Sequence, residues 1–162
     1  MPGKSHHYPV TVTWTGNTGA GTARVNAYSK DHEVAANSKP VIPAASDPSF
    51  GGDPTRWNPE ELLVASLSQC HMLWYLSRCA RNHIVVTAYV DNAEGTMTED
   101  ASGGGCFDHV VLRPEITLAD EKDQERADAL HHEAHELCFI ANSVNFPVTV
   151  EPVYGTAISE SP

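Results

Sequence analysis

The sequence predicts an α+β domain whose sheets are mainly antiparallel. Segments with the alternation of strands are followed by helical patterns, without the strict strand–helix–strand order of a parallel sheet. The chain has 162 residues, a length typical of one domain with one core. We therefore expect a single domain over residues 1–162, with an ordered core at about residues 8–153.

Alternating apolar and polar residues mark the expected strands. We expect the first two to pair with each other, and the last two to form a meander around Gly103-Gly104-Gly105. A short last strand is expected at residues 147–153, a long loop at 37–53, and a frayed end at 159–162. The other four expected strands are residues 10–15, 22–28, 84–92 and 107–118, and the alternation is present in the first, third and fourth.

Two helices are expected. The first begins at Asn58-Pro59-Glu60-Glu61, where asparagine is a good N-cap, proline suits the first helical position and a carboxylate stands at the third, and it runs to about Asn82. It is apolar on several faces, so we expect it at the centre of the fold. The second covers about residues 120–141, polar at its start and apolar at its end.

Composition excludes some classes of protein. The formal net charge is −11 and the 10 lysines and arginines are scattered, which argues against nucleic-acid binding. Polar residues interrupt the longest apolar run, residues 62–76, so no membrane span is expected. The first ten residues, MPGKSHHYPV, lack a signal-peptide pattern, and we expect a cytoplasmic protein.

Two of the four cysteines, Cys70 and Cys138, stand in the apolar stretches of the expected helices. A free cysteine is usually a small buried hydrophobe, but in the cytoplasm a pair able to form a disulfide is more often catalytic or redox-sensing than structural. A reactive thiol needs nearby cations or hydrogen-bond donors, because the thiolate is the nucleophile. Arg56 and Arg24 are the candidates, and Cys79 and Cys106 are expected to be structural.

Three stretches of the chain resemble the OsmC/Ohr family of hydroperoxide-reducing proteins. They are Arg-Trp-Asn-Pro-Glu-Glu-Leu-Leu at residues 56–63, Ser-Gln-Cys at 68–70 and Ala-His-Glu-Leu-Cys at 134–138. The resemblance extends from the first strand to Val150, and the Asn-Pro-Glu-Glu motif at its set distance from a cysteine is its most specific part.

The resemblance implies an intertwined homodimer, with two central helices wrapped by sheets and active sites at the subunit interface. Cys70 resembles the peroxidatic cysteine, Cys138 the resolving cysteine and Glu60 the carboxylate that orients the arginine of the site. Arg56 is the first choice for that arginine and Arg24 the second. In the best-known members proline follows the second cysteine, whereas Phe139 follows it here.

The spacing of Glu60 and Cys70 adds an argument of its own. Ten residues of straight helix rise about 15 Å, so the two side chains cannot meet within one helix. If both serve one site, Glu60 must come from a second chain, which favours an obligate dimer.

The expected reaction is the cofactor-free reduction of organic hydroperoxides to alcohols. The Cys70 thiolate attacks the peroxide to give a sulfenic acid, which condenses with Cys138 to a disulfide. Apolar neighbours, Met72, Trp74 and Phe139, favour alkyl or lipid hydroperoxides. An external dithiol must reset the enzyme, and the resemblance implies a lipoylated protein.

Two alternatives remain. His131 and His135 are four residues apart and would share a helix face, as two zinc ligands do, but neither zinc-hydrolase motif is complete and no third ligand stands out, so no metal is expected. The other alternative is a non-enzymatic stress-response or ligand-binding dimer that kept the fold and lost the chemistry. His71 is expected to serve packing or to lie at the surface.

Overall fold

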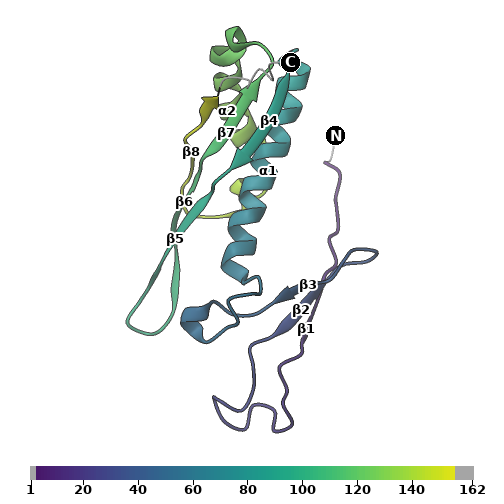
Figure 1. Ribbon diagram of the computed structural model, residues 1–162, viewed down its shortest axis with the longest axis vertical. Coiled ribbons are helices and arrows are strands. Elements are labelled where there is room, and N and C mark those ends of the chain that lie inside the picture. Colours follow the sequence, from purple (N-terminus) through teal and green to yellow (C-terminus); the bar gives the residue numbers. More distant parts are fainter. Residues whose placement is uncertain (1–2, 156–162) are drawn as a thin grey trace, which may run out of the picture. The chain divides into compact units, whose positions relative to one another are not determined.

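The computed structural model describes residues 3–155, which form two compact units, residues 3–62 and 63–155 (Figure 1). The boundary falls in the first turn of the long helix α1 (Pro59–Arg81), which therefore contributes to both units. The single domain over residues 1–162 stays a prediction. The frayed end expected at residues 159–162 lies outside the described residues.

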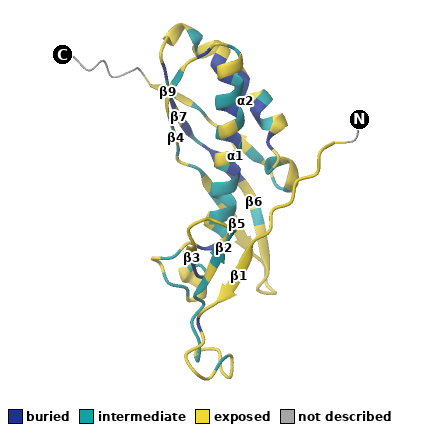
Figure 2. Cartoon of the chain, turned by 90° about the vertical axis from the view of Figure 1, so that its right-hand side faces the viewer, coloured by how far each residue is buried: buried dark blue, intermediate teal, exposed yellow. Residues whose placement is uncertain are grey.

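The first unit contains a three-stranded antiparallel sheet, with the expected strand at residues 10–15 at one edge. The order is β1 (Thr11–Trp14), β2 (His32–Ala35) and β3 (Ile42–Ala44). Val12, Val34 and Ile42 face one another across the three strands. All of β1 is exposed, as the yellow arrow in Figure 2 shows. The sheet thus carries an apolar row in which Val12 and Ile42 are exposed and Val34 is half-buried.

The strand expected at residues 22–28 is wrong. This segment is a series of turns, and only Tyr28 makes an isolated bridge, to Asn17. The Asn17 side chain accepts hydrogen bonds from the backbone of Gly19 and Gly21, and Gly21 has a φ of 54°. This turn chemistry folds the segment on itself, so the strand that pairs with β1 begins only at His32.

The long loop expected at residues 37–53 is only partly a loop. It contains β3 and a short 3-10 helix, η1 (Pro48–Phe50). The Asp47 side chain caps η1 by accepting a hydrogen bond from the Ser49 backbone N–H at 2.7 Å. The segment therefore completes the sheet and then turns the chain towards α1.

Helix α1 begins and ends where the sequence predicts, to within one residue. Asn58 Oδ1 accepts a hydrogen bond from the Glu61 backbone N–H at 2.7 Å, and the Glu61 carboxylate accepts one from the Asn58 backbone N–H at 3.2 Å. These two bonds form a capping box. After Asn82, His83 takes a left-handed φ of 59°, which ends the helix.

The second unit contains two three-stranded sheets made from one long, interrupted hairpin. Strands β4 (Val86–Asp91) and β7 (Pro114–Leu118) pair in one sheet, while β5 (Glu94–Glu99) and β6 (Gly105–Leu112) pair in the other, all antiparallel. The expected meander is therefore wrong. The sequence analysis did not predict β5, and the chain reverses between β5 and β6, so that β4 pairs with β7 and not with the next strand along the chain.

The expected last strand at residues 147–153 is two strands. β8 (Val148–Val150) pairs with β6 and β9 (Val153–Gly155) pairs with β7, both in parallel. Each therefore becomes the third strand of one sheet. The observed fold class is α+β with mainly antiparallel sheets, as predicted.

Helix α2 (Gln124–Leu137) packs on α1 and the sheet of β4, β7 and β9. It follows a short 3-10 helix, η2 (Glu121–Asp123), and another, η3 (Ala141–Ser143), comes after it. The helix expected over residues 120–141 is thus shorter at both ends. The buried core around α2 combines residues of α1, β7 and α2 with one residue of the turn between α1 and β4. They are Tyr75, Cys79, Ile84, Ile116, Leu118, Ala127, Leu130 and Ala134.

Within residues 3–155, no helix has both the length and the apolar character that crossing a bilayer requires.

Candidate functional site

The second unit brings the thiols of Cys70 and Cys138 together. Cys70 lies on α1 and is half-buried, whereas Cys138 is 1% exposed. The sequence analysis expected Cys138 inside the second helix, but it is the C-cap residue of α2 and stands just after that helix. Each thiol is a close neighbour of the other, and both are free. A buried and a partly accessible thiol thus face each other without a disulfide.

The surroundings of Cys138 keep it protonated. Burial above all, together with the neighbouring Cys70 side chain, raises the pKa of the Cys138 thiol to about 11. The backbone N–H of Ala141 donates to Cys138 Sγ at 3.5 Å and opposes this rise only in part. At neutral pH Cys138 therefore holds its proton and is a poor first nucleophile.

Aromatic side chains form an apolar surface beside the two thiols. Trp74 follows Cys70 by one helical turn, Phe139 follows Cys138 directly, and their ring centroids lie 5.7 Å apart in an edge-to-face contact. Phe139 is 69% exposed and Leu73 is 61% exposed. These side chains offer contacts to an apolar ligand or to another protein surface.

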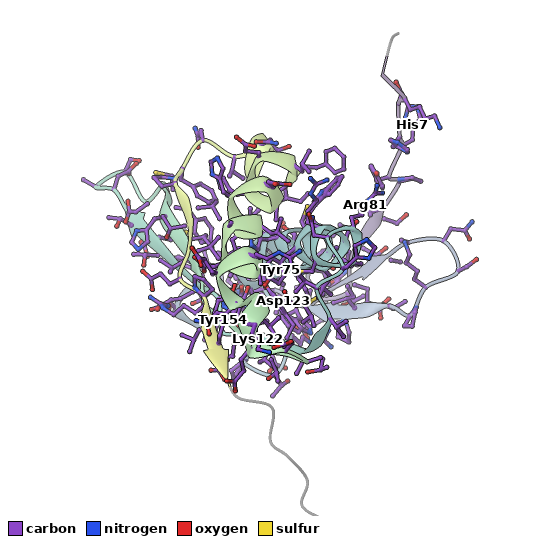
Figure 3. The ribbon with its side chains drawn as sticks, turned by 90° about the horizontal axis from the view of Figure 1, so that it is seen from above. His7, Tyr75, Arg81, Lys122, Asp123 and Tyr154 are labelled. Atoms are coloured by element: carbon purple, nitrogen blue, oxygen red, sulfur yellow. The ribbon has the colours of Figure 1, made fainter. Side chains whose placement is uncertain are left out.

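His71, the residue after Cys70, is buried and does not serve as a surface residue. Its Nε2 lies 2.9 Å from Nδ1 of His131, on α2, and the Tyr75 ring stacks on His131 with centroids 4.0 Å apart. Figure 3 shows Tyr75 on α1 beside α2. Burial lowers the pKa of His71 to about 4 and that of His131 to about 3. The pair is therefore neutral at physiological pH.

Glu60 and Arg56 belong to the first unit. Glu60 stands at the second position of α1, and its Oε2 is buried without a hydrogen bond from any residue that the structure describes. Arg56 Nε lies 3.7 Å from an Asp31 carboxylate oxygen and 3.9 Å from one of Asp53. The guanidinium predicted to activate a thiol is thus shared by two carboxylates.

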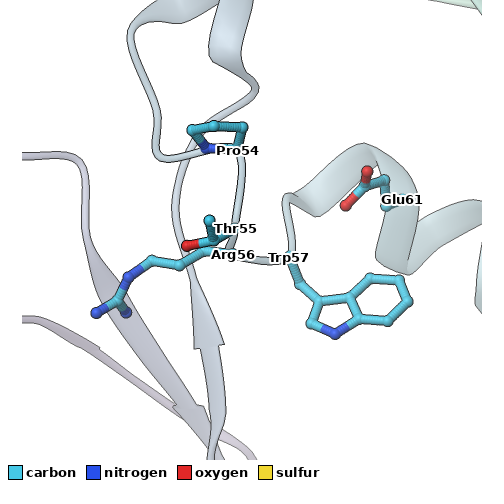
Figure 4. A pocket seen from close by; sticks show the side chains of 5 residues that line it. All are labelled: Pro54, Thr55, Arg56, Trp57 and Glu61. Carbon is cyan, nitrogen blue, oxygen red and sulfur yellow. The ribbon is translucent and has the colours of Figure 1, made fainter.

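A shallow hollow in the first unit lies next to Arg56 (Figure 4). The Arg56 side chain extends to one side of the backbone segment that carries it, and the Trp57 and Glu61 side chains lie on the opposite side. Trp57 is 50% exposed. The residues that line the hollow are Pro54, Thr55, Arg56, Trp57 and Glu61.

Arg24, the second choice for the activating arginine, is exposed in the turns of residues 22–28. The backbone carbonyl of Arg24 accepts a hydrogen bond from the Ala27 N–H, as in a turn. Since the predicted strand does not form, no sheet fixes the direction of this side chain.

The zinc alternative had paired His131 with His135, but the structure pairs His131 with His71 instead. Among residues 3–155, no three histidine, cysteine or acidic side chains converge as a metal site would require. Of the two cysteines expected to be structural, Cys79 is buried in the core and Cys106 is exposed on β6.

The sequence reasoning missed the His71–His131 pair. The two residues are 60 positions apart, and no local pattern joins them. One signal was present: His131 continues the spacing of Ala127, Ala134 and Cys138, which is an apolar face at helical intervals. A histidine on such a face is buried and must find a polar partner from another element.

The sequence profile of the OsmC-like protein family matches residues 51–153, which include α1, both central cysteines and α2. The chain belongs to the OsmC-like protein family. A search among curated protein sequences gave no match.

Solved structures share the fold. An OsmC-like protein of unknown function from Vibrio cholerae is 33% identical, with a TM-score of 0.82 over 92% of this chain and 100% of that one. An organic hydroperoxide resistance protein from Elizabethkingia anophelis is 18% identical, with a TM-score of 0.67 over 95% and 99%. Another, from Legionella pneumophila, is 19% identical, with a TM-score of 0.67 over 94% and 99%.

Proposed function

We propose that this chain is a cysteine-based peroxidase that reduces organic hydroperoxides to alcohols. The observation that carries the proposal is the pairing of a half-buried Cys70 with a buried, protonated Cys138. The names of the hydroperoxide resistance proteins that share the fold give it further support. The proposal places the protein in the cytoplasm, where cellular dithiols keep such cysteines reduced between turnovers.

In the proposed first step, the Cys70 thiolate attacks the distal oxygen of the hydroperoxide. The O–O bond breaks, an S–O bond forms, and the alkoxide leaves and takes up a proton to become an alcohol, so that Cys70 is oxidised to a sulfenic acid. An arginine stabilises the charge on the leaving oxygen. We assign this role to Arg56, with Arg24 as the alternative.

In the second step Cys138 attacks the sulfenic sulfur. The S–S bond forms and the S–O bond breaks, and the hydroxide leaves as water with the proton that Cys138 carried. The high pKa of Cys138 suits this order, because a protonated thiol does not compete with Cys70 for the peroxide. An external dithiol, such as a lipoylated protein, then reduces the disulfide.

The apolar surface of Trp74, Phe139 and Leu73 supports an alkyl, aryl or lipid group on the substrate. Hydrogen peroxide has no group that could contact it. The proposal therefore ranks organic hydroperoxides above hydrogen peroxide as substrates.

We further propose that the working unit is a homodimer. Glu60 and Cys70 are ten residues apart on α1, so one chain cannot bring both to one reacting atom. A buried carboxylate oxygen without a donor is unfavourable, and Glu60 Oε2 is such an atom within the described chain. A second copy would supply the arginine that Glu60 lacks.

One observation favours a second candidate, a non-enzymatic ligand-binding dimer. Arg56 is already near Asp31 and Asp53, and a guanidinium held by two carboxylates is less available to activate a thiol. Such a protein would bind apolar molecules at Trp74 and Phe139 without oxidising them.

A thiol titration separates the two candidates. The reduced protein is treated with one equivalent of cumene hydroperoxide and its free thiols are counted. The peroxidase loses two thiols and yields a Cys70–Cys138 peptide, while Cys138→Ser accumulates a sulfenic acid that dimedone labels at Cys70. Retention of all thiols in the wild-type protein would favour the binding protein instead.

A further inference from the structure

The buried histidine pair lies between the two helices that carry the thiols. His71 comes directly after Cys70 on α1, and His131 precedes Cys138 by seven residues, which is about two turns of helix. His131 and Ala134 lie on the buried face of α2, and Cys138, the C-cap residue, follows at the next helical interval and is also buried. The N···N contact of 2.9 Å thus joins α1, at the residue after Cys70, to α2, about two turns before Cys138.

The histidine contact is a hydrogen bond, so its geometry depends on the relative position of the two rings, whereas the surrounding apolar packing imposes no such requirement. Both rings are neutral, so one nitrogen of the contact must donate its proton and the other must accept it. The remaining nitrogens, His71 Nδ1 and His131 Nε2, are buried and make no hydrogen bond with the described residues. Each ring therefore has one polar partner among the described residues. If α2 slid along α1, that bond would break and all four ring nitrogens would be buried without a hydrogen-bond partner.

Neighbouring rings fix the orientation of the pair. Tyr75, one turn after His71 on α1, stacks on His131, and its hydroxyl lies 3.3 Å from that of Tyr154 on β9. The two imidazole planes differ by only 5°. Such constraints hold the polar contact in one geometry.

We propose that the His71–His131 hydrogen bond is a positioning device that sets the register of α2 on α1 and so holds Cys138 within reach of Cys70. The inference rests on the proposed roles of the two cysteines. Neither histidine touches the peroxide. They act through the thiols, by raising the effective concentration of one cysteine at the other.

The test is a redox titration of the Cys70–Cys138 pair in glutathione buffers, which needs no hydroperoxide. The two protein thiols lose two protons and two electrons, and one glutathione disulfide becomes two glutathione thiols. The equilibrium ratio gives the effective concentration of the thiol pair. Cys79 and Cys106 are replaced by serine in all variants so that only this pair titrates.

His131→Leu is expected to lower the effective concentration about tenfold, because His71 Nε2 loses its partner and the register of the helices is no longer fixed. His131→Asn, whose amide can occupy the position of Nδ1, is expected to restore it to within about twofold of the wild type. The matched control is Arg78→Gln, which breaks the pairing of Arg78 with Glu133 between the same two helices at the solvent side. It is expected to leave the value unchanged.

The double variant His71→Leu/His131→Leu covers the case in which His131→Leu fails to fold, because replacing both partners leaves no unpaired polar atom. It is expected to show the same tenfold loss. A leucine variant that folds and keeps the wild-type value, or an equal loss in Arg78→Gln, would overturn the inference. The inference would also be overturned if the protein with both native histidines formed no Cys70–Cys138 disulfide in the glutathione buffers. If the disulfide forms and the variants behave as expected but the protein does not consume hydroperoxide, only the proposed function would be contradicted.

Discussion

Cys70 and Cys138 are neighbours with unequal surroundings, and this difference assigns their proposed roles. Cys138 is almost fully buried, which raises its pKa, while Cys70 is partly open to solvent. In the proposed reaction, a peroxide would therefore reach Cys70 first, and Cys138 would react only after a sulfenic acid had formed beside it. The order of the two steps follows from burial alone, without any assumption about the arginine.

The buried histidines predict how stability depends on pH. In the folded chain the pKa of His71 is about 4 and that of His131 about 3, against an ordinary value of 6.5. Because the folded pKa values are lowered, their contribution to stability is complete above about pH 6.5 and is lost as the pH falls towards 4 and 3. Urea unfolding midpoints should fall steadily between pH 6.5 and 4.5.

His71→Gln should reduce this loss on acidification, whereas His132→Gln should not, because His132 is an exposed histidine on α2, next to the buried His131. The half-buried His135 faces His71 and contributes to the lowered pKa of that ring. A wild-type protein whose urea midpoint is constant between pH 6.5 and 4.5 would contradict the neutral, buried pair.

At the scale of elements, local signals explain what could be predicted. Helix α1 could be predicted because Asn58, Pro59 and Glu61 are all start signals within four residues, and two of them, Asn58 and Glu61, form the capping box in the structure. Both central cysteines could be found because each stands in an apolar stretch with a family motif nearby. These features need no knowledge of distant contacts.

The missed elements depend on long-range pairing. Strand β5 has the polar sequence Glu-Gly-Thr-Met-Thr-Glu, and it forms because β6 lies beside it in register. Strand β3 contains Pro43, which usually argues against a strand, but it lies at the sheet edge. Residues 22–28 include the strand-forming residues Thr22, Val25 and Tyr28, yet the turn around Asn17 and Gly21 decides their path.

The capping box predicts the effect of a single substitution. Asn58→Ala removes the acceptor for the Glu61 N–H and should lower the free energy of unfolding by about 1 kcal/mol. Asn58→Ser keeps an acceptor and should lose much less, and Asn37→Ala, in an exposed loop, should change nothing. Urea denaturation measures all three. Equal stabilities for Asn58→Ala and Asn58→Ser would show that the cap does not stabilise α1.

At the scale of the whole molecule, the exposed apolar surface is the main argument for assembly. In the first unit, Val12 is 63% exposed on the open face of its sheet, and in the second, Leu73 and Phe139 are exposed beside the thiols. Soluble monomers rarely leave such side chains uncovered in groups. A second copy of the chain would bury them and would also bring a donor to Glu60.

Mixed dimers test whether the site is shared between chains. Glu60→Gln and Cys70→Ser should each be inactive alone. When they are unfolded together and refolded as an equal mixture, half of the dimers contain one chain of each kind, and one of their two sites has both native residues. The mixture should therefore recover about a quarter of the wild-type activity. No recovery from a mixture shown to contain mixed dimers would contradict a site shared in this way.

The most direct measurement is the steady-state consumption of cumene hydroperoxide with a dithiol reductant, by the wild-type protein, Cys70→Ser, Cys138→Ser and the exposed-cysteine control Cys106→Ser. The account predicts turnover in the wild type and in Cys106→Ser, none in Cys70→Ser, and slower turnover of hydrogen peroxide than of the organic substrate. Wild-type protein that consumes no hydroperoxide, or Cys70→Ser that consumes it as fast as wild type, would contradict the account.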